Sequence, residues 1–129
     1  MTLDELNLHF EALTELNSAR ERLESMMSFL KAQSLDGMPK APGVSRSVEK
    51  LAILIDQQRE AVGRMETIVR NSEVPIREWI DTIRDNRTAQ IFSLRFLCGY
   101  EWSVVALIVG GRNTEDSVKS VCYRYLQAK

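Results

Sequence analysis

The stretch LRFLCGYEWSVVALIVGGRNTEDSVKSVCYRYL, from Leu94 to Leu126, decides the fold of the chain's second half. Its apolar residues recur at helical spacing in three short runs, and glycines interrupt the pattern after the first and the second run. The last run follows Asn113 and Thr114, and either residue is a good helix N-cap. We therefore expect three short helices, with the sequence GGRN as the turn between the last two.

A short helix, a glycine-containing turn and a second helix are the parts of a helix-turn-helix motif, in which the two helices cross steeply. Ala106 supplies a small residue in the middle of the first helix, and the second helix has an apolar inward face. The alternative is a helical hairpin within an ordinary bundle, and the spacing alone does not decide between the two. The residues expected inward on the last helix are Val118, Val121, Cys122, Tyr125 and Leu126.

The outward face of the last helix and its entry carry side chains of the types that contact DNA. Arginine binds guanine through two hydrogen bonds, serine reaches base edges, and lysine contacts phosphates. Glu115 and Asp116 weigh against DNA contact, although acidic residues also stabilise the first turn of any helix. The candidate DNA contacts are Arg112, Ser117, Lys119, Ser120, Tyr123 and Arg124.

The first half of the chain predicts two long antiparallel helices over residues 1–72. Apolar residues alternate spacings of four and three along both, as in the seams of coiled coils. Glycines and prolines between them predict a loop near 34–47, with Ser47 as the N-cap of the second helix. The second seam ends at NSEVP, where Pro75 should begin a new helix. The chain thus divides into a helical hairpin, 1–72, and a helix-turn-helix domain, 75–129.

Composition supports an all-α protein. Of the 129 residues, 44% are hydrophobic and 27% are charged, and we find no strand-like alternation. The net charge of −1 combines −3 over the first 74 residues with +2 over 75–129, where eight Lys/Arg face six Asp/Glu. No apolar run approaches the roughly 20 residues that cross a bilayer. The acidic start MTLDEL lacks the basic region of a signal peptide, so we expect a cytoplasmic protein without a membrane segment.

The polar and cysteine residues that stand alone in the sequence are expected to have structural roles rather than catalytic or metal-binding ones. His9 is the only histidine, so a Ser-His-Asp or Cys-His centre lacks partners, and we expect no enzymatic activity. Cys98 and Cys122 form no CxxC pair and occupy apolar-periodic positions, which predicts two buried thiols and no metal site. Gln58 is the polar member of the second seam, and we expect it at the solvent-facing edge rather than as a register-setting contact. No motif predicts a cofactor.

The segment from Ser93 to Gln127 resembles the C-terminal helix-turn-helix of sigma-factor region four. It is more similar still to small phage and prophage proteins of Gram-positive bacteria that carry this module, namely late-gene activators and autolysin-regulatory-type transcriptional regulators. These proteins place a coiled-coil-like hairpin and a Gly/Pro-containing loop in front, so the resemblance covers most of the chain. In the first helix of the motif, SVVALIV replaces the acidic and more soluble residues of the family. The matching residues are Leu94, Arg95, Phe96, Leu97, Gly99, Trp102, Val105, Ala106, Val109, Gly110, Thr114, Glu115, Val118, Val121 and Leu126.

The resemblance implies a phage-derived transcriptional regulator that places the helix from Thr114 in the major groove of double-stranded DNA. The hairpin would then form a homodimer or contact RNA polymerase. The alternative is a protein-interaction module that kept the fold, lost DNA binding and contacts polymerase or another regulator through the hairpin. A structural component of a phage particle is a third option, which no residue pattern favours.

Overall fold

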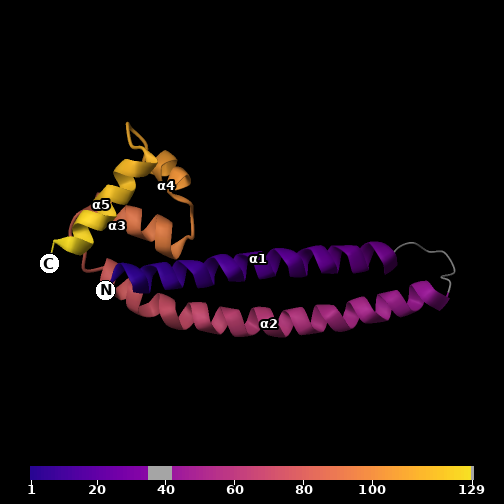
Figure 1. Cartoon of the computed structure of the whole chain (residues 1–129). Coiled ribbons are helices and arrows are strands. Elements are labelled where there is room, and N and C mark those ends of the chain that lie inside the picture. The colour runs from indigo at the N-terminus through magenta and orange to yellow at the C-terminus, as the bar shows by residue number, and fades with distance from the viewer. Residues whose placement is uncertain (35–41, 129) are drawn as a thin grey trace. The chain divides into compact units, whose positions relative to one another are not determined.

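The structure, a computed structural model, describes residues 1–34 and 42–128, and the regular elements in this part of the chain are all helices (Figure 1). Two long helices form a hairpin, and three short helices with one π-helical turn follow them. The predicted all-α class is confirmed. The elements are α1 (Leu3–Ser34), α2 (Pro42–Ile80), α3 (Asn86–Phe92), the π-helix η1 (Ser93–Leu97), α4 (Trp102–Val109) and α5 (Glu115–Gln127).

Both long helices contribute to two compact units. The hairpin unit consists of residues 15–67, and the bundle unit combines 1–14 with 68–129. The first turns of α1 and the last turns of α2 therefore belong with the short helices. The functional division into 1–72 and 75–129 stays a prediction.

In the hairpin unit, α1 and α2 contact each other along a narrow apolar seam. Gln58, which we expected at the solvent-facing edge, is half-buried instead, and its side-chain amide donates a hydrogen bond of 3.1 Å to the Ala19 carbonyl. At the surface, the Arg20 guanidinium lies 3.3 Å from the Glu66 carboxylate. These polar contacts join the two helices beside a small core, which consists of Leu16, Ala19, Ile55 and Val62.

In the bundle unit, the short helices pack around one core together with the ends of α1 and α2. Aromatic rings fill its centre: Trp79 meets Phe92 edge-on at 5.0 Å between centroids, and Tyr125 lies 5.8 Å from both rings. Edge-to-face pairs of this kind stabilise a core beyond the area that they bury. The buried members are Leu6, Ile76, Ile80, Ile83, Ile91, Phe92, Phe96, Trp102, Val105, Ala106, Val118 and Cys122.

The predicted start of the second helix is wrong. Helix α2 begins at Pro42, so Ser47 lies inside the helix and cannot be its N-cap. Proline suits the first turn of a helix because its ring fixes a helical φ and because the first N–H groups have no partner within the helix. The predicted loop near 34–47 therefore ends earlier, and its residues 35–41 lie outside the described part of the chain.

The predicted helix start at Pro75 is also wrong, because Pro75 lies inside α2. A proline in a helix removes one hydrogen bond, here the bond to the carbonyl of Asn71. Asn71 is exposed, so water can solvate that carbonyl. Ile76 and Ile80 are 3% and 5% exposed, and their burial in the core holds the last turns of α2 in place.

One of the two cysteines departs from the prediction. Cys122 is buried, as expected, but Cys98 is exposed. The π-helix before it changes the number of residues per turn, so a pattern read at 3.6 residues per turn places Cys98 on the wrong side. Gly99 then ends the segment with a φ of 77°.

Candidate functional site

The turn between α4 and α5 has a defined conformation. Gly110 and Gly111 have φ values of 77° and 65°, in the left-handed region that favours glycine. The side-chain amide of Asn113 donates a hydrogen bond of 2.7 Å to the Gly110 carbonyl. The Arg87 guanidinium in turn donates to the Asn113 side-chain oxygen. This chain of contacts ties the turn to α3, so the predicted GGRN connection is a fixed element rather than a loose linker.

A capping box begins α5. Of the two N-cap residues that the sequence allowed, Thr114 occupies the position, and its hydroxyl accepts a hydrogen bond of 3.2 Å from the Ser117 backbone N–H. The Ser117 hydroxyl accepts a hydrogen bond of 2.8 Å from the Thr114 N–H. Two backbone donors that the first turn would leave open are thereby satisfied. The Ser117 side chain thus has a structural task at the start of α5.

Helices α4 and α5 pack on each other through small and β-branched side chains. Val105 and Ala106 from α4 are buried, as are Val118 and Cys122 from α5. Burial raises the pKa of the Cys122 thiol to about 12, because the thiolate would lose its hydration. The expected inward face of α5 is confirmed at Val118 and Cys122, and its other members, Val121, Tyr125 and Leu126, pack partly buried against the same core.

Arg95 connects the start of α1 to the start of α4. Its guanidinium lies 3.6 Å from the centroid of the Phe10 ring and 4.7 Å from that of Trp102. It also donates a hydrogen bond of 3.1 Å to the Tyr100 carbonyl. Burial lowers the pKa of the guanidinium from its usual value, and the two aromatic faces stabilise the charge that burial penalises. The arginine that carried part of the family resemblance is therefore a packing element in this chain.

The six candidate DNA-contact residues differ in their solvent exposure and in the interactions that their side chains already make. Arg112 and Arg124 are exposed, and Ser120 is half-buried. Lys119 is half-buried, with its ammonium group 3.9 Å from the Glu115 carboxylate. Ser117 is engaged in the capping box. The remaining candidate, Tyr123, is 39% exposed and lies edge-on to Trp102 at 6.5 Å.

Helical spacing brings four of these candidates together. Lys119, Ser120, Tyr123 and Arg124 follow one another at intervals of one and three to four residues, so they lie on one side of α5 away from Val118. Arg112 lies in the turn that leads into the helix. The arrangement offers two cations and two hydroxyl groups on α5 and a third cation in the turn before it, which suits contact with phosphates and base edges.

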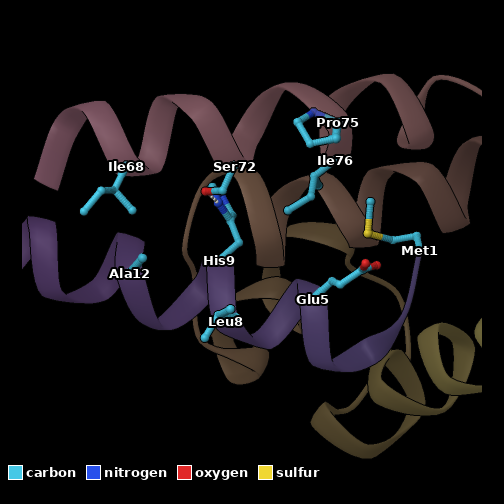
Figure 2. A pocket seen from close by; sticks show the side chains of 9 residues that line it. All are labelled: Met1, Glu5, Leu8, His9, Ala12, Ile68, Ser72, Pro75 and Ile76. Atoms are coloured by element: carbon cyan, nitrogen blue, oxygen red, sulfur yellow. Dashed lines mark hydrogen bonds between the residues drawn. The ribbon is translucent and has the colours of Figure 1, made fainter.

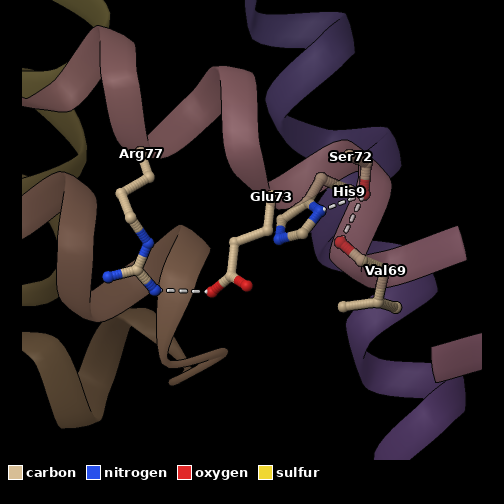
Figure 3. A network of polar contacts seen from close by, with 5 residues as sticks. All are labelled: His9, Val69, Ser72, Glu73 and Arg77. Atoms are coloured by element: carbon tan, nitrogen blue, oxygen red, sulfur yellow. Dashed lines mark hydrogen bonds and ion pairs between the residues drawn. The ribbon is translucent and has the colours of Figure 1, made fainter. Parts of the chain in front are cut away.

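A polar network near the start of α1 has no counterpart in the sequence prediction (Figure 3). The Ser72 hydroxyl donates to the Val69 carbonyl at 3.1 Å, and its oxygen lies 2.5 Å from Nδ1 of His9. His9 is 3% exposed, and its Nε2 has no hydrogen-bond partner among the described residues. Burial lowers the pKa of His9, although the Glu73 carboxylate opposes this shift. The contact between His9 and Ser72 joins α1 to α2 within the bundle unit.

The same network borders a pocket of about 310 Å³ in the bundle unit (Figure 2). Two of its polar lining groups have partners: the Glu5 carboxylate accepts a hydrogen bond of 2.8 Å from the Thr2 N–H, and Ser72 contacts His9. The remaining lining residues are apolar except for His9 itself, whose Nε2 has no partner among the described residues. The lining residues are Met1, Glu5, Leu8, His9, Ala12, Ile68, Ser72, Pro75 and Ile76.

Within the described ranges, 1–34 and 42–128, no group of three or more His, Cys, Asp or Glu side chains is placed to hold a metal ion. No helix in this part of the chain combines the length and the apolar character needed to cross a membrane.

The chain matches no family model, and no similar curated protein or solved structure is found.

Proposed function

We propose that this protein is a phage-type, DNA-binding transcriptional regulator, similar to sigma-factor region four, that acts through α4 and α5. One observation carries the proposal. Helix α5 is capped at Thr114, follows a turn that hydrogen bonds hold in place, and directs a row of cationic and hydroxyl side chains away from the core. A recognition helix needs this rigidity, because base contacts depend on fixed placement of the side chains.

In the proposed complex, α5 lies in the major groove of double-stranded DNA. Arg124 and Tyr123 contact base edges, while Lys119 and Arg112 contact phosphates. The ion pair between Lys119 and Glu115 does not oppose this role, because a partly exposed pair at 3.9 Å contributes little and can exchange for a phosphate. Ser117 and Ser120 complete the candidate set, with Ser117 acting mainly through the cap.

A single helix buries a modest surface on DNA, so specific affinity needs a second anchor. In this proposal, the hairpin provides the anchor by forming a homodimer or by contacting RNA polymerase. The protein works in the cytoplasm, without enzymatic activity, metal or cofactor.

The proposal is tested by fluorescence anisotropy with labelled fragments from the genomic neighbourhood of the gene. The Arg112→Ala/Lys119→Ala double variant should weaken binding to all fragments and make it less sensitive to salt, because two phosphate contacts are lost. Arg124→Ala should instead reduce the preference for the best fragment, since a good base contact contributes about 1–3 kcal/mol of discrimination.

Arg84→Ala is the matched control, because Arg84 is exposed in the same unit but lies outside α5. It should bind as the wild type does. Equal loss of binding in Arg84→Ala and in the α5 variants would mean that general charge, rather than α5, holds the DNA.

A second candidate function is a protein-interaction module that contacts polymerase or another regulator through the hairpin. The supporting observation is that the hairpin unit exposes large apolar side chains: Met27, Phe29, Ile53 and Leu54 are between 41% and 59% exposed. Exposed apolar residues mark a protein contact where they form one contiguous patch. Salt separates the two functions, because counterion release makes DNA binding steeply salt-dependent and leaves an apolar protein contact almost unchanged.

A further inference from the structure

Helix α4 has an apolar face on the side that points away from the core. Its eight residues, WSVVALIV, include no charged side chain. Val104, Leu107 and Ile108 are 36%, 81% and 46% exposed, and Tyr100, which lies just before the N-cap of α4, is 41% exposed. We call these four residues the α4 face.

Val104, Leu107 and Ile108 lie side by side because they follow one another at the three- and four-residue spacing of helical neighbours, and Tyr100 precedes the N-cap residue at the start of the same helix. A helix that is apolar on all sides is typical of a helix covered on all sides, whereas a solvent-facing helix normally carries charges outward. A contiguous apolar face rimmed by polar residues marks a contact site. The α4 face therefore fits a protein partner that also presents an uncharged, apolar surface.

The charges at the two ends of the α4 face indicate which partner. Glu101 is the N-cap residue of α4, and Arg112 follows the end of the helix by three residues; both are exposed. Eight helical residues span about 12 Å, so the two charges lie at opposite ends of the face. A second α4 placed antiparallel would bring its arginine to this glutamate and its glutamate to this arginine, with opposed helix dipoles. A parallel copy would bring like charges together.

We propose that the α4 face binds a second copy of this chain in a two-fold, antiparallel arrangement. A two-fold contact pairs the same surface on both copies, so the apolar faces cover each other and both Glu101–Arg112 pairs form together. The midpoint between the two charged positions falls beside Leu107, which places the Leu107 side chains of the two copies near the symmetry axis. The dimer forms in the absence of DNA, where Arg112 can pair with Glu101 of the second copy instead of a phosphate, so the proposal does not depend on DNA binding.

Sedimentation of the full chain without DNA gives the first test. The wild type should dimerise as its concentration rises, and Leu107→Glu should remain a monomer because it would place two carboxylates near the axis. Leu8→Glu is the matched control: Leu8 is 69% exposed in the same unit but lies on α1, so this variant should still dimerise. Circular dichroism checks that all three chains are folded. A folded wild type that stays monomeric at every concentration, or a dimer that Leu8→Glu disrupts and Leu107→Glu does not, overturns the proposal.

Cross-linking tests the geometry. In a Cys98→Ser background, which removes the exposed native thiol, Leu107→Cys should form a disulfide between two copies, because such a bond needs Cα atoms within about 7 Å. Ser103→Cys is the control, since Ser103 is exposed on the same helix but lies off the axis. Faster cross-linking of Ser103→Cys than of Leu107→Cys would exclude the antiparallel arrangement.

The proposed ion pairs between Glu101 and Arg112 of the two copies can be tested through the dissociation constant of the dimer. Arg112→Gln should raise the dissociation constant of the dimer about fivefold, because it removes two exposed ion pairs from the assembly. Arg84→Gln should leave the constant unchanged. An equal effect of the two variants would mean that the Glu101–Arg112 pairs do not form.

Discussion

Replacing Thr114 by Ala tests whether the capping box holds α5 in place. The substitution removes the hydroxyl that accepts the Ser117 N–H at 3.2 Å. Loss of a threonine N-cap costs about 1 kcal/mol, within a range of about 0.5–2 kcal/mol. The cap is exposed, so water takes over part of the lost hydrogen bond, and we expect the cost near the middle of this range.

For a domain of this size, a loss of about 1 kcal/mol lowers the melting temperature by about 3–5 °C. Thermal unfolding followed by circular dichroism measures this shift. Thr14→Ala is the matched control, because Thr14 is an exposed threonine in the same unit whose hydroxyl bonds only to the Phe10 carbonyl within α1. It should change the free energy of unfolding by less than about 0.5 kcal/mol. Equal melting temperatures for Thr114→Ala and Thr14→Ala would refute the stabilising role of the cap.

Substitution of Ser117, the partner of Thr114 in the capping box, should affect stability and DNA binding differently. A glutamate at the third position after a threonine N-cap makes a strong capping box, so Ser117→Glu should keep the melting temperature within about 1–2 °C of the wild type. The same variant should bind DNA more weakly, because it adds a negative charge to the proposed DNA-facing end of α5. A loss of stability in Ser117→Glu would contradict the assignment of Ser117 to the cap.

Three further predictions concern the core of the bundle unit. Burial lowers the pKa of His9 below 6.5, so the unfolded chain binds a proton at this residue more readily than the folded chain does. The contribution of neutral, buried His9 to the free energy of unfolding should therefore be complete above pH 6.5 and should be lost as the pH falls below it. Urea unfolding on both sides of pH 6.5 should show this slope in the wild type and a flatter one in His9→Gln, and equal slopes would count against the effect. Arg95→Met should lower the free energy of unfolding by about 2 kcal/mol through loss of two cation–π contacts, with Arg95→Lys intermediate; an unchanged value would exclude them. A thiol reagent should label Cys98 in the native chain and reach Cys122 only after unfolding, and fast native labelling at both sites would contradict the burial of Cys122.

The features that were predicted correctly depend on the preferences of residues close together in the sequence. The N-cap at Thr114 and the turn through Gly110 and Gly111 depend on residue types whose preferences act over a few positions. Hydrophobic periodicity likewise placed Val118 and Cys122 inward, because an α-helix keeps the same 3.6-residue period along its length.

The predictions were wrong where contacts between residues distant in the sequence determine the local structure. Pro75 is a sound helix start by local rules, yet the burial of Ile76 and Ile80 in the core carries α2 past it. Cys98 follows a π-helix, which no spacing rule for α-helices anticipates. In the candidate site, the sandwich of Arg95 between Phe10 and Trp102 joins residues far apart in the chain, so its packing role could not be derived from local pattern.

The central claim, that α5 binds DNA, is tested most directly by the salt dependence of wild-type binding to the best fragment from the genomic neighbourhood. If Arg112 and Lys119 each neutralise one phosphate, log K should fall with log salt concentration with a slope of about −2 for each chain bound. A folded protein that fails to bind any fragment at low salt, or whose binding is indifferent to salt, would contradict the account and favour a protein partner.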